Sequence, residues 1–580
     1  MMDFIEAIND VIWHKYVLFA VLGTGVLFTV WSGFCQYRAL THGVAVTRGK
    51  YDNPDDPGAI NHFQALSAAL SATVGLGNIG GVALAIGLGG PGAVFWMWVV
   101  GVVGMALKTT EVTLAMLYRN TDDPDNPHGG AMWVVSKGVA KWKPSLAWLG
   151  KLVGGIFCVT LIVSAITGGN MFQSWNVADL THHYFGVPQI ATGIVLAILV
   201  GMVIIGGIKR IGAVAGRLVP AMCAMYLVAA VYVLIVKIDV VPAMLVLIVK
   251  SAFSPLEAQG AFIGGTLGYA FLMGMKRALF SNEAGQGSAP IAHAAAKTSE
   301  PVREAVVAGL EPFIDTIVVC TLTALVILSS GIWNRGPEAT LDVLPRVVAV
   351  ENKADTWTLE ETDVSEIVTD EWTDKVKIIV IGAPNKDTGN RLYSITGELQ
   401  REGDSASIKW DKDNVTSTTQ PTFELEDTDV APGSLFFVYK GAVLTAEAFD
   451  RVTDGLGKYL VTLAAWLFAI STMISWSYYG EQGIVYLAGR RWVTPYKYVY
   501  CLLIIVAAIP WLVSTEKQLD VLTGLGTGVM LLANIPIMLI FGHQAMKAYH
   551  RYMARLKAGE FPVHAAPKIT DVVSGKDVED

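Results

Sequence analysis

The chain has 580 residues, of which 53% are hydrophobic and only 16% charged, with a formal net charge of −8. Its mean hydropathy of +0.48 excludes an ordinary soluble domain and indicates a protein that crosses a membrane many times. Crossing a bilayer core of about 30 Å takes roughly 20 apolar residues. Eleven such runs follow in chain order, near 15–37, 63–89, 92–118, 147–175, 189–208, 212–236, 268–298, 303–331, 452–478, 494–514 and 518–545.

The basic residues between these runs predict how the chain is oriented. If the amino terminus is outside, the inner loops and the tail contain 21 Lys and Arg, whereas the short outer loops contain six. Basic residues resist translocation, so they accumulate on the cytoplasmic side. We therefore expect an outer amino terminus and, after eleven spans, a cytoplasmic carboxyl terminus.

One long segment between the eighth and ninth runs does not belong to the membrane. From Arg335 to Arg451 it contains 23 acidic and 12 basic residues, and it alternates in short strand-like runs such as KVKIIVIG and RLYSITGEL. We interpret it as a small β-rich insert on the outer face. The expected organisation is a membrane part over 1–335, the insert over 336–446, further membrane helices over 447–546, and a cytoplasmic tail over 547–580.

Two of the apolar runs contain an interruption of the same kind. The second run holds SATVGLGNIG from Ser71, and the seventh holds SNEAGQGSAP from Ser281. Both follow the pattern SxxxGxG with a small polar residue after it, and they lie five runs apart. Paired glycine-rich interruptions at corresponding places in two halves of a chain are typical of secondary transporters built from inverted repeats.

The physical chemistry of the bilayer favours a binding site at these interruptions. Each glycine costs about 1 kcal/mol relative to alanine in a helix, and unwound backbone is tolerated at membrane depth only where protein, ions or a wet cavity satisfy it. The free N–H groups at the start of a half-helix suit a carboxylate, while the carbonyls released at the end of the preceding one suit a cation or an ammonium group. An amino-acid zwitterion with Na⁺ would satisfy both.

Ionisable and polar groups inside the apolar runs are further candidates, because each is costly in a membrane. Glu283 lies in the second interruption and Asp315 in the middle of the eighth run. Lys108 and Glu111 are three residues apart, which predicts a salt bridge on one helix face. His293 falls on the second half-helix, and two interpretations stay open for it, a place near the inner exit or a packing residue with its polar groups satisfied.

The sequence contains none of the motifs of competing chemistries. GxxxxGK[ST] for nucleotides, HExxH for zinc and CxxC are all missing. We expect a transporter and not an enzyme, without an organic cofactor, without a metal other than Na⁺, and without nucleic acid as a partner. Its partners are the lipid bilayer and a small-molecule substrate.

The runs TVGLGNIGGVALAIGLGGPGAVFWMW and FSNEAGQGSAPIAHAAAKTSEPVREAVVAGLEPFIDTIVVCTLTALVIL resemble the alanine or glycine:cation symporter family. The resemblance extends over residues 15–331 and 452–545 and leaves out the insert. It implies an all-α membrane protein of about eleven helices, with two inverted five-helix repeats and two discontinuous helices in a leucine-transporter-like fold. It also implies a place in the bacterial cytoplasmic membrane.

The resemblance also implies roles for individual residues. Sodium would be bound at the first interruption and by a hydroxyl pair on the ninth run, and the substrate would lie between the two interruptions, closed off by aromatic side chains. The implied sodium residues are Ser71, Val74, Asn78, Asp315, Ser471 and Thr472. The implied substrate residues are Thr73, Gly75, Gly77, Phe172, Gln173, Asn282, Glu283, Gly285 and Trp476.

These observations predict a secondary symporter that uses the Na⁺ gradient to take up alanine or glycine. Two alternatives stay open from the residues alone. The coupling ion can be H⁺ instead of Na⁺, or the chain can be a transporter-like sensor whose outer β insert binds the ligand. A channel is a third and weaker interpretation.

Overall fold

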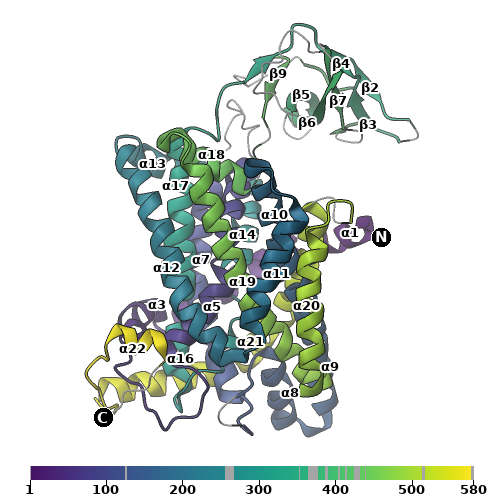
Figure 1. Ribbon diagram of the computed structural model, residues 1–580. Coiled ribbons are helices and arrows are strands. Elements are labelled where there is room, and N and C mark those ends of the chain that lie inside the picture. Colours follow the sequence, from purple (N-terminus) through teal and green to yellow (C-terminus); the bar gives the residue numbers. More distant parts are fainter. Residues whose placement is uncertain are drawn as a thin grey trace.

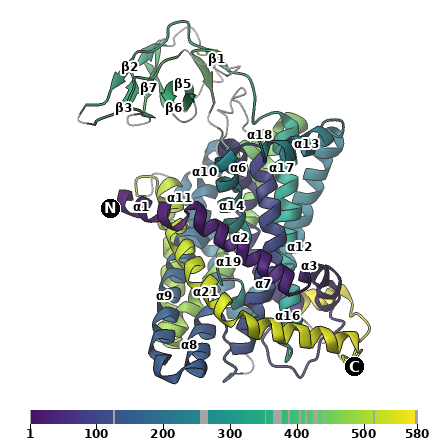
Figure 2. The same ribbon diagram turned by 180° about the vertical axis from the view of Figure 1, so that it is seen from behind.

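The computed structural model describes residues 2–123, 127–254, 267–351, 353–363, 377–385, 389–402, 405–411, 415–423, 431–437, 439, 441–512 and 516–575. Long helices form one upright bundle, and short strands form a separate cap at one end of it (Figure 1). This confirms the predicted helical membrane protein with a small strand-rich insert. The two termini lie toward opposite ends of the bundle (Figure 2).

The helices are named α, and short π-helical or 3₁₀ turns are named η. Those before residue 255 are α1 (Met2–Ile12), α2 (Lys15–Trp31), α3 (Cys35–Arg38), η1 (Ala39–Gly43), α4 (Val44–Thr47), α5 (His62–Thr73), η2 (Gly77–Gly81), α6 (Val82–Gly89), α7 (Gly92–Tyr118), α8 (Ala131–Trp142), η3 (Pro144–Leu146), α9 (Ala147–Ile166), η4 (Thr167–Met171), α10 (Phe172–Phe185), α11 (Gln189–Ile204), α12 (Gly207–Val236) and α13 (Val241–Ser251). Those after residue 266 are α14 (Leu267–Asn282), α15 (Pro290–His293), α16 (Pro301–Ala308), η5 (Phe313–Cys320), α17 (Thr321–Ser330), α18 (Ala442–Thr453), α19 (Gly457–Ala488), η6 (Arg490–Trp492), α20 (Val493–Ala507), α21 (Glu516–Lys557) and α22 (Ile569–Ser574).

All eleven predicted runs coincide with helices. Six helical stretches in the described part of the chain are individually long and apolar enough to span a membrane, and counting two bent pairs as single spans gives eight. The other three runs fall on α11, α14 with α15, and α20, which are shorter. Among the described residues, α1, α4, α8, α13 and α22 lie outside the predicted runs, and α18 overlaps the ninth run only at its end.

The first interruption bends its helix sharply. The axes of α5 and of the helical stretch from Gly77 to Gly89 differ by 53°. Gly75 lies at the bend, where a Cβ atom would be only 2.7 Å from the Thr472 hydroxyl oxygen. A side chain at this position would therefore force the Thr472 hydroxyl to turn away from the bend, so its present place beside the first interruption needs glycine.

The second interruption is a loop between α14 and α15. Glu283, Gly285 and Gly287 have φ angles of 55°, 84° and 80°, which lie in the left-handed region that glycine adopts at little cost. Glu283 has a Cβ atom and is strained in this conformation. Backbone strain of this kind, held in the middle of a bundle, marks the loop as a place to look for function.

The insert consists of two antiparallel sheets with their own small apolar core. The strands are β1 (Ala339–Thr340), β2 (Val347–Ala349), β3 (Thr356–Leu359), β4 (Thr362–Asp363), β5 (Lys377–Asn385), β6 (Gly389–Glu402), β7 (Ser405–Trp410), β8 (Val415–Thr416) and β9 (Ser434–Phe436). One sheet has the order β1-β9-β5-β6-β7-β4 and the other β2-β3-β8. Ile395, Leu399 and Ile408 are buried in a cluster that is separate from the core of the bundle.

The two ends of the insert are tied together, so it can be removed without disturbing the bundle. Thr340 pairs with Ser434 across β1 and β9, and the Phe437 N–H donates a 2.9 Å hydrogen bond to Glu338. Paired residues on antiparallel strands lie about 5 Å apart. We expect a chain in which a short Gly-Asn turn replaces residues 341–433 to elute in detergent as a single symmetric peak, slightly later than the larger full chain, with a melting temperature within a few degrees of it. Aggregation of the shortened chain would contradict this.

Candidate functional site

A small enclosed cavity of about 30 Å³ lies between the two interrupted helices. Its wall combines the first interruption with parts of α9, η4, α10, α14, α19, α21 and the second interruption. The lining residues are Ala72, Thr73, Gly75, Gly77, Ser164, Gly168, Gln173, Phe280, Ser281, Glu283, Gln286, Thr472, Trp476, Thr523 and Thr527. Residues distant in sequence are therefore brought together at the place where both helices are interrupted.

Five polar side-chain atoms on this wall are buried and have no hydrogen-bond partner among the described residues. They are the hydroxyl oxygens of Ser164, Thr472 and Thr523 and the amide oxygens of Gln173 and Gln286. Burying an unpaired polar group is costly, so such groups are rare in folded proteins. Five of them around one cavity make it a candidate site for a polar ligand. The two amide oxygens can only accept hydrogen bonds, whereas the hydroxyls can donate or accept.

A buried carboxylate lies beside the first interruption. Asp315 on η5 accepts a hydrogen bond from the Asn78 amide, bonds of 2.9 and 3.1 Å from the Ser281 hydroxyl, and one of 2.8 Å from Thr316. The Asn78 amide oxygen in turn accepts a 2.8 Å hydrogen bond from the Gly75 N–H. No basic side chain forms an ion pair with Asp315 in the described structure. A buried negative charge with only neutral donors around it is a favourable place for a small cation.

A second group of oxygen atoms lies where α5 packs against α19. The Ser71 hydroxyl donates a 2.6 Å hydrogen bond to the Ser471 carbonyl, and the Ser471 hydroxyl lies 3.3 Å from the Ser71 carbonyl. Thr472, with its unpaired hydroxyl, follows directly, and Val74 is buried at the end of α5. Neutral carbonyl and hydroxyl oxygens in such a cluster are the ligands that Na⁺, a hard cation, can use.

The second interruption has most of its polar groups paired by the protein itself. The Asn534 amide on α21 donates a 2.9 Å bond to the Gly285 carbonyl, and the Gly287 N–H donates a 3.2 Å bond to Glu111. Asn282 donates to Thr316 at 2.9 Å, and Glu283 accepts from Ser288. These hydrogen bonds therefore hold the loop in one defined conformation.

The structure places the sequence-predicted residues in three groups. Thr73, Gly75, Gly77, Gln173, Glu283 and Trp476 line the cavity, as does Thr472 from the predicted sodium set. Ser71, Val74 and Ser471 lie at the contact of α5 with α19, while Asn78 and Asp315 form the carboxylate cluster. The remaining three lie outside these groups. Phe172 lines a neighbouring small cavity, Asn282 bonds both its own loop and Thr316 on η5, and Gly285 is bonded by Asn534 on α21.

Sequence reasoning missed several residues of the cavity wall. Ser164, Phe280, Gln286, Thr523 and Thr527 line it without having been selected. Thr523 and Thr527 are one helical turn apart in the last run, which was the available signal. Hydroxyls in membrane helices mostly bond to their own backbone, as Thr527 does at 2.9 Å to the Thr523 carbonyl, so the spacing alone could not single them out.

A chain of alternating acidic and basic side chains runs from the cavity region toward the end of the bundle opposite the strands. The Lys108 amine lies 3.2 Å from Glu311, and Glu311 lies 2.6 Å from the His293 ring. The other His293 nitrogen contacts Glu304, and Glu304 contacts His62. All five side chains are buried.

This network extends two sequence predictions. Lys108 was expected to pair with Glu111 and lies 4.0 Å from it, but its nearer partner is Glu311 on another helix, at 3.2 Å. His293 was weighed as a packing residue with its polar groups satisfied, and both of its nitrogens contact buried carboxylates. A prediction from one helix could not find these partners, because Glu311 is 203 positions from Lys108.

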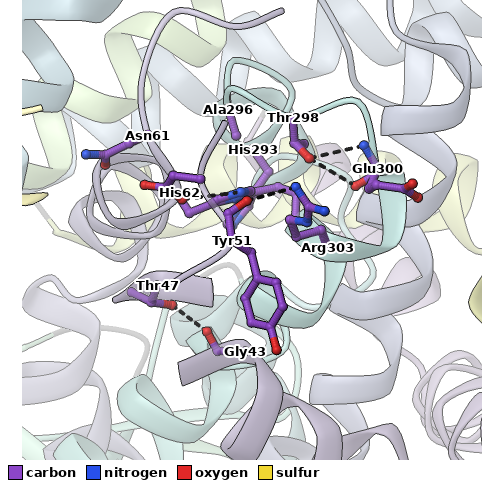
Figure 3. Close-up of polar contacts among 12 residues, drawn as sticks. Gly43, Thr47, Tyr51, Asn61, His62, His293, Ala296, Thr298, Glu300 and Arg303 are labelled. Atoms are coloured by element: carbon purple, nitrogen blue, oxygen red, sulfur yellow. Dashed lines mark hydrogen bonds and ion pairs between the residues drawn. The ribbon is translucent and has the colours of Figure 1, made fainter. Parts of the chain in front are cut away.

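The end of the network that is farther from the cavity is fixed by the loop that precedes α5. His62 and His293 lie next to each other there, and the guanidinium of Arg303 donates a 2.9 Å hydrogen bond to the Tyr51 carbonyl (Figure 3). Thr298 closes the turn before α16 through a 3.1 Å bond from the Glu300 N–H. The network thus joins α5, before the first interruption, to α15, after the second one.

The chain belongs to the sodium:alanine symporter family, whose sequence profile matches residues 1–358 and 433–566. It is therefore a multi-pass membrane transporter for amino acids. The unmatched residues between these ranges fall in the strand insert, as the resemblance in the sequence implied.

Named relatives agree with this assignment. The chain is 34% identical over 526 residues to a protein named sodium/alanine symporter AgcS from Methanococcus maripaludis, covering 90% of this chain and 92% of the relative. It is 29% identical to the amino-acid carrier protein AlsT of Bacillus subtilis, covering 99% and 96%. A crystal structure of MhsT in complex with L-phenylalanine aligns with a TM-score of 0.47 and 12% identity, covering 84% of this chain and 89% of that one.

The buried network of charged side chains leads to a prediction about the stability of the protein. Lys108→Met leaves Glu111 and Glu311 facing each other without their shared cation, and removing one partner of a buried ion pair costs about 3–5 kcal/mol. We expect the melting temperature in detergent to fall by several degrees, and the second substitution Glu111→Gln to restore part of it. Lys209→Met, which removes an exposed charge, is the control. Equal melting temperatures for Lys108→Met and the control would contradict the role given to Lys108.

Proposed function

We propose that the protein is a symporter that couples inward movement of Na⁺ to uptake of a small neutral amino acid, alanine or glycine. The observation that carries this proposal is the position of the Asp315 cluster and the cavity. A buried carboxylate without an ion-pair partner in the described structure lies directly beside a cavity lined by five unpaired polar atoms. The carboxylate suits a cation, and the cavity suits a small polar molecule.

Two sodium positions are supported by the donor sets. In the first, Asn78, Ser281 and Asp315 would surround the ion, and the negative charge of Asp315 would offset its charge at membrane depth. In the second, Ser71, Val74, Ser471 and Thr472 would supply neutral oxygens. Since Gly75 and Asn78 are connected by a hydrogen bond of 2.8 Å, an ion at the first position would also order the backbone that faces the cavity.

The substrate would lie in the cavity with its two charged groups in different surroundings. The N–H group of Gly77, where η2 begins, suits the carboxylate, and the Gly75 N–H would reach it only by exchanging its 2.8 Å bond to Asn78. Glu283 and the amide oxygens of Gln173 and Gln286 suit the ammonium group. Asn282 and Gly285 would act by shaping the second interruption. Thr73, Phe280 and Trp476 would leave little room for a side chain, which favours alanine or glycine over larger amino acids.

Aromatic side chains separate the cavity from the end that carries the strands. Phe172 and Phe280 are in edge-to-face contact with ring centroids 6.0 Å apart, and Phe280 borders both the main cavity and a smaller one beyond it. We propose that this pair closes the outer path when the substrate is bound. The rocking of one group of helices against another about the two interruptions would then open the opposite path.

The basic ends of the helices favour a bacterial cytoplasmic membrane as the location, with the amino terminus and the insert outside and the carboxyl terminus inside. In this orientation Na⁺ enters along its gradient and along the membrane potential. Because the zwitterion has no net charge, each Na⁺ carries one positive charge inward, which a potential of 100 mV favours by about 2.3 kcal/mol.

The direct test is uptake by purified protein in liposomes. With Na⁺ outside and an inside-negative potential, labelled alanine or glycine should accumulate above its equilibrium level, and replacing Na⁺ by choline should abolish accumulation. An outer-acid pH gradient without Na⁺ tests coupling to H⁺ instead. Accumulation driven only by that gradient would reject Na⁺ coupling. Binding of alanine without accumulation under either gradient would support the sensor interpretation.

Asp315→Asn tests the first sodium position. Removing the buried negative charge should raise the Na⁺ concentration for half-maximal uptake by about tenfold or more, which corresponds to about 1.4 kcal/mol of binding free energy. Asp239→Asn, at an exposed turn between α12 and α13, is the matched control and should leave it unchanged. An unchanged Na⁺ dependence in a folded Asp315→Asn variant would remove Asp315 from the sodium site.

A further inference from the structure

A large groove opens at the end of the bundle opposite the strands, away from the cavity described above. It has a volume of about 1130 Å³ and lies between the end of α7, the end of α8, the start of α16 and the second half of α21. The second half of α21 runs across this end of the bundle (Figure 2). No residue lines both the groove and the cavity between the interrupted helices.

The groove is strongly basic. His543, Lys547, Arg551 and Arg555 follow one another at intervals of four along α21, which places them on one side of the helix, and Lys141 faces them from α8. The only acidic residue that lines the groove is Glu300, and it is bonded to Arg555 at 2.8 Å. Lys141, Lys547 and Arg551 form no ion pair with any residue that the structure describes. The groove therefore holds an excess of positive charge.

Glu300 does not neutralise these three cations because it is held on the α16 side of the groove. Its backbone N–H donates to Thr298 (Figure 3) and its carboxylate is occupied by Arg555. The floor is fixed as well, since the Tyr118 hydroxyl donates to Gln544 and the Tyr118 ring packs against Phe541 with centroids 6.0 Å apart. The basic side chains thus surround a preformed depression.

The rim of the groove is apolar and exposed. Trp142 is 69% exposed, Ile540 53% and Leu117 41%. The surface of α9 next to α8 continues this rim with exposed Trp148 and Leu152. Exposed apolar side chains on a membrane protein face the acyl chains, and tryptophan is enriched where acyl chains meet headgroups. The groove is therefore open to lipid on one side and basic on the other.

We propose that the groove binds an anionic phospholipid, with its phosphate among Lys141, Lys547 and Arg551 and its acyl chains along Leu117, Trp142 and Ile540. Basic pockets between membrane helices on the cytoplasmic side are suited to anionic headgroups. A soluble phosphate would use the charges but not the apolar rim. An acidic protein segment would use the charges from the aqueous side, and it would not explain why Trp142 and Ile540 border them.

The test compares the triple variant Lys141→Gln/Lys547→Gln/Arg551→Gln with the control Arg48→Gln/Lys209→Gln/Arg210→Gln. The control removes the same number of exposed basic residues outside the groove. The full chain is placed in phosphatidylcholine nanodiscs, phosphatidylglycerol is titrated in, and bound lipid is counted by native mass spectrometry. Each basic residue near an anionic surface contributes a factor of about five. We therefore expect the triple variant to bind phosphatidylglycerol roughly 100-fold more weakly, and the control to match the unmodified protein.

Two further measurements test the proposal and can reject it. The melting temperature of the triple variant in phosphatidylcholine alone should equal that of the unmodified protein, and only its increase with phosphatidylglycerol should be lost. Equal phosphatidylglycerol binding by both variants would overturn the proposal. Inorganic phosphate or glycerol phosphate that displaces the bound phosphatidylglycerol at equal concentration would show a site for a soluble anion, and it would also overturn it. Neither result depends on which amino acid is transported.

Discussion

The structure depends on one constraint, which is that backbone polar groups cannot be left unpaired inside a bilayer. Two of its helices are interrupted there, and side chains from distant segments satisfy the exposed groups. Asn534 from α21 bonds the Gly285 carbonyl, Glu111 from α7 bonds the Gly287 N–H, and Asn78 bonds the Gly75 N–H within the first interruption. Each interruption therefore requires a particular set of neighbours, and the bundle is arranged to provide them.

The buried charges follow from the same constraint. Glu111 accepts a hydrogen bond from the Gly287 N–H, and Lys108, one turn earlier on α7, lies 4.0 Å from its carboxylate. Lys108 is shared with Glu311, which in turn contacts His293, and the sequence of acid and base continues to Glu304 and His62. A buried ion pair adds little stability by itself, but breaking one is costly. The network thus holds its helices in one fixed arrangement.

Features that depend only on short segments of the chain could be predicted from the sequence. The apolar runs, the two SxxxGxG interruptions and the acidic strand-forming insert can all be read within a few tens of residues, because each depends on periodicity or glycine content. The cavity itself was only partly predictable. Thr73 and Gly75 lie in a recognisable motif, whereas Ser164 and Thr523 differ from ordinary membrane-helix hydroxyls only through their unpaired state in the folded protein. Burial and pairing are properties of the packed bundle, and no single segment carries them.

The location of the charge network affects which helices can move relative to one another. His62, Lys108, His293, Glu304 and Glu311 come from α5, α7, α15 and the segment from α16 to η5, so every member lies on the interrupted helices or on the two helices next to them. The contacts across to α19 are different in kind, since Ser71 on α5 and Ser471 on α19 are joined by neutral hydrogen bonds of 2.6 and 3.3 Å. Neutral hydrogen bonds are weaker and easier to exchange with water than buried charge pairs. Among these contacts, the ones that join the charge-linked helices to α19 therefore cost least to break when the helices move against each other. The boundary between those helices and α19 runs through the cavity.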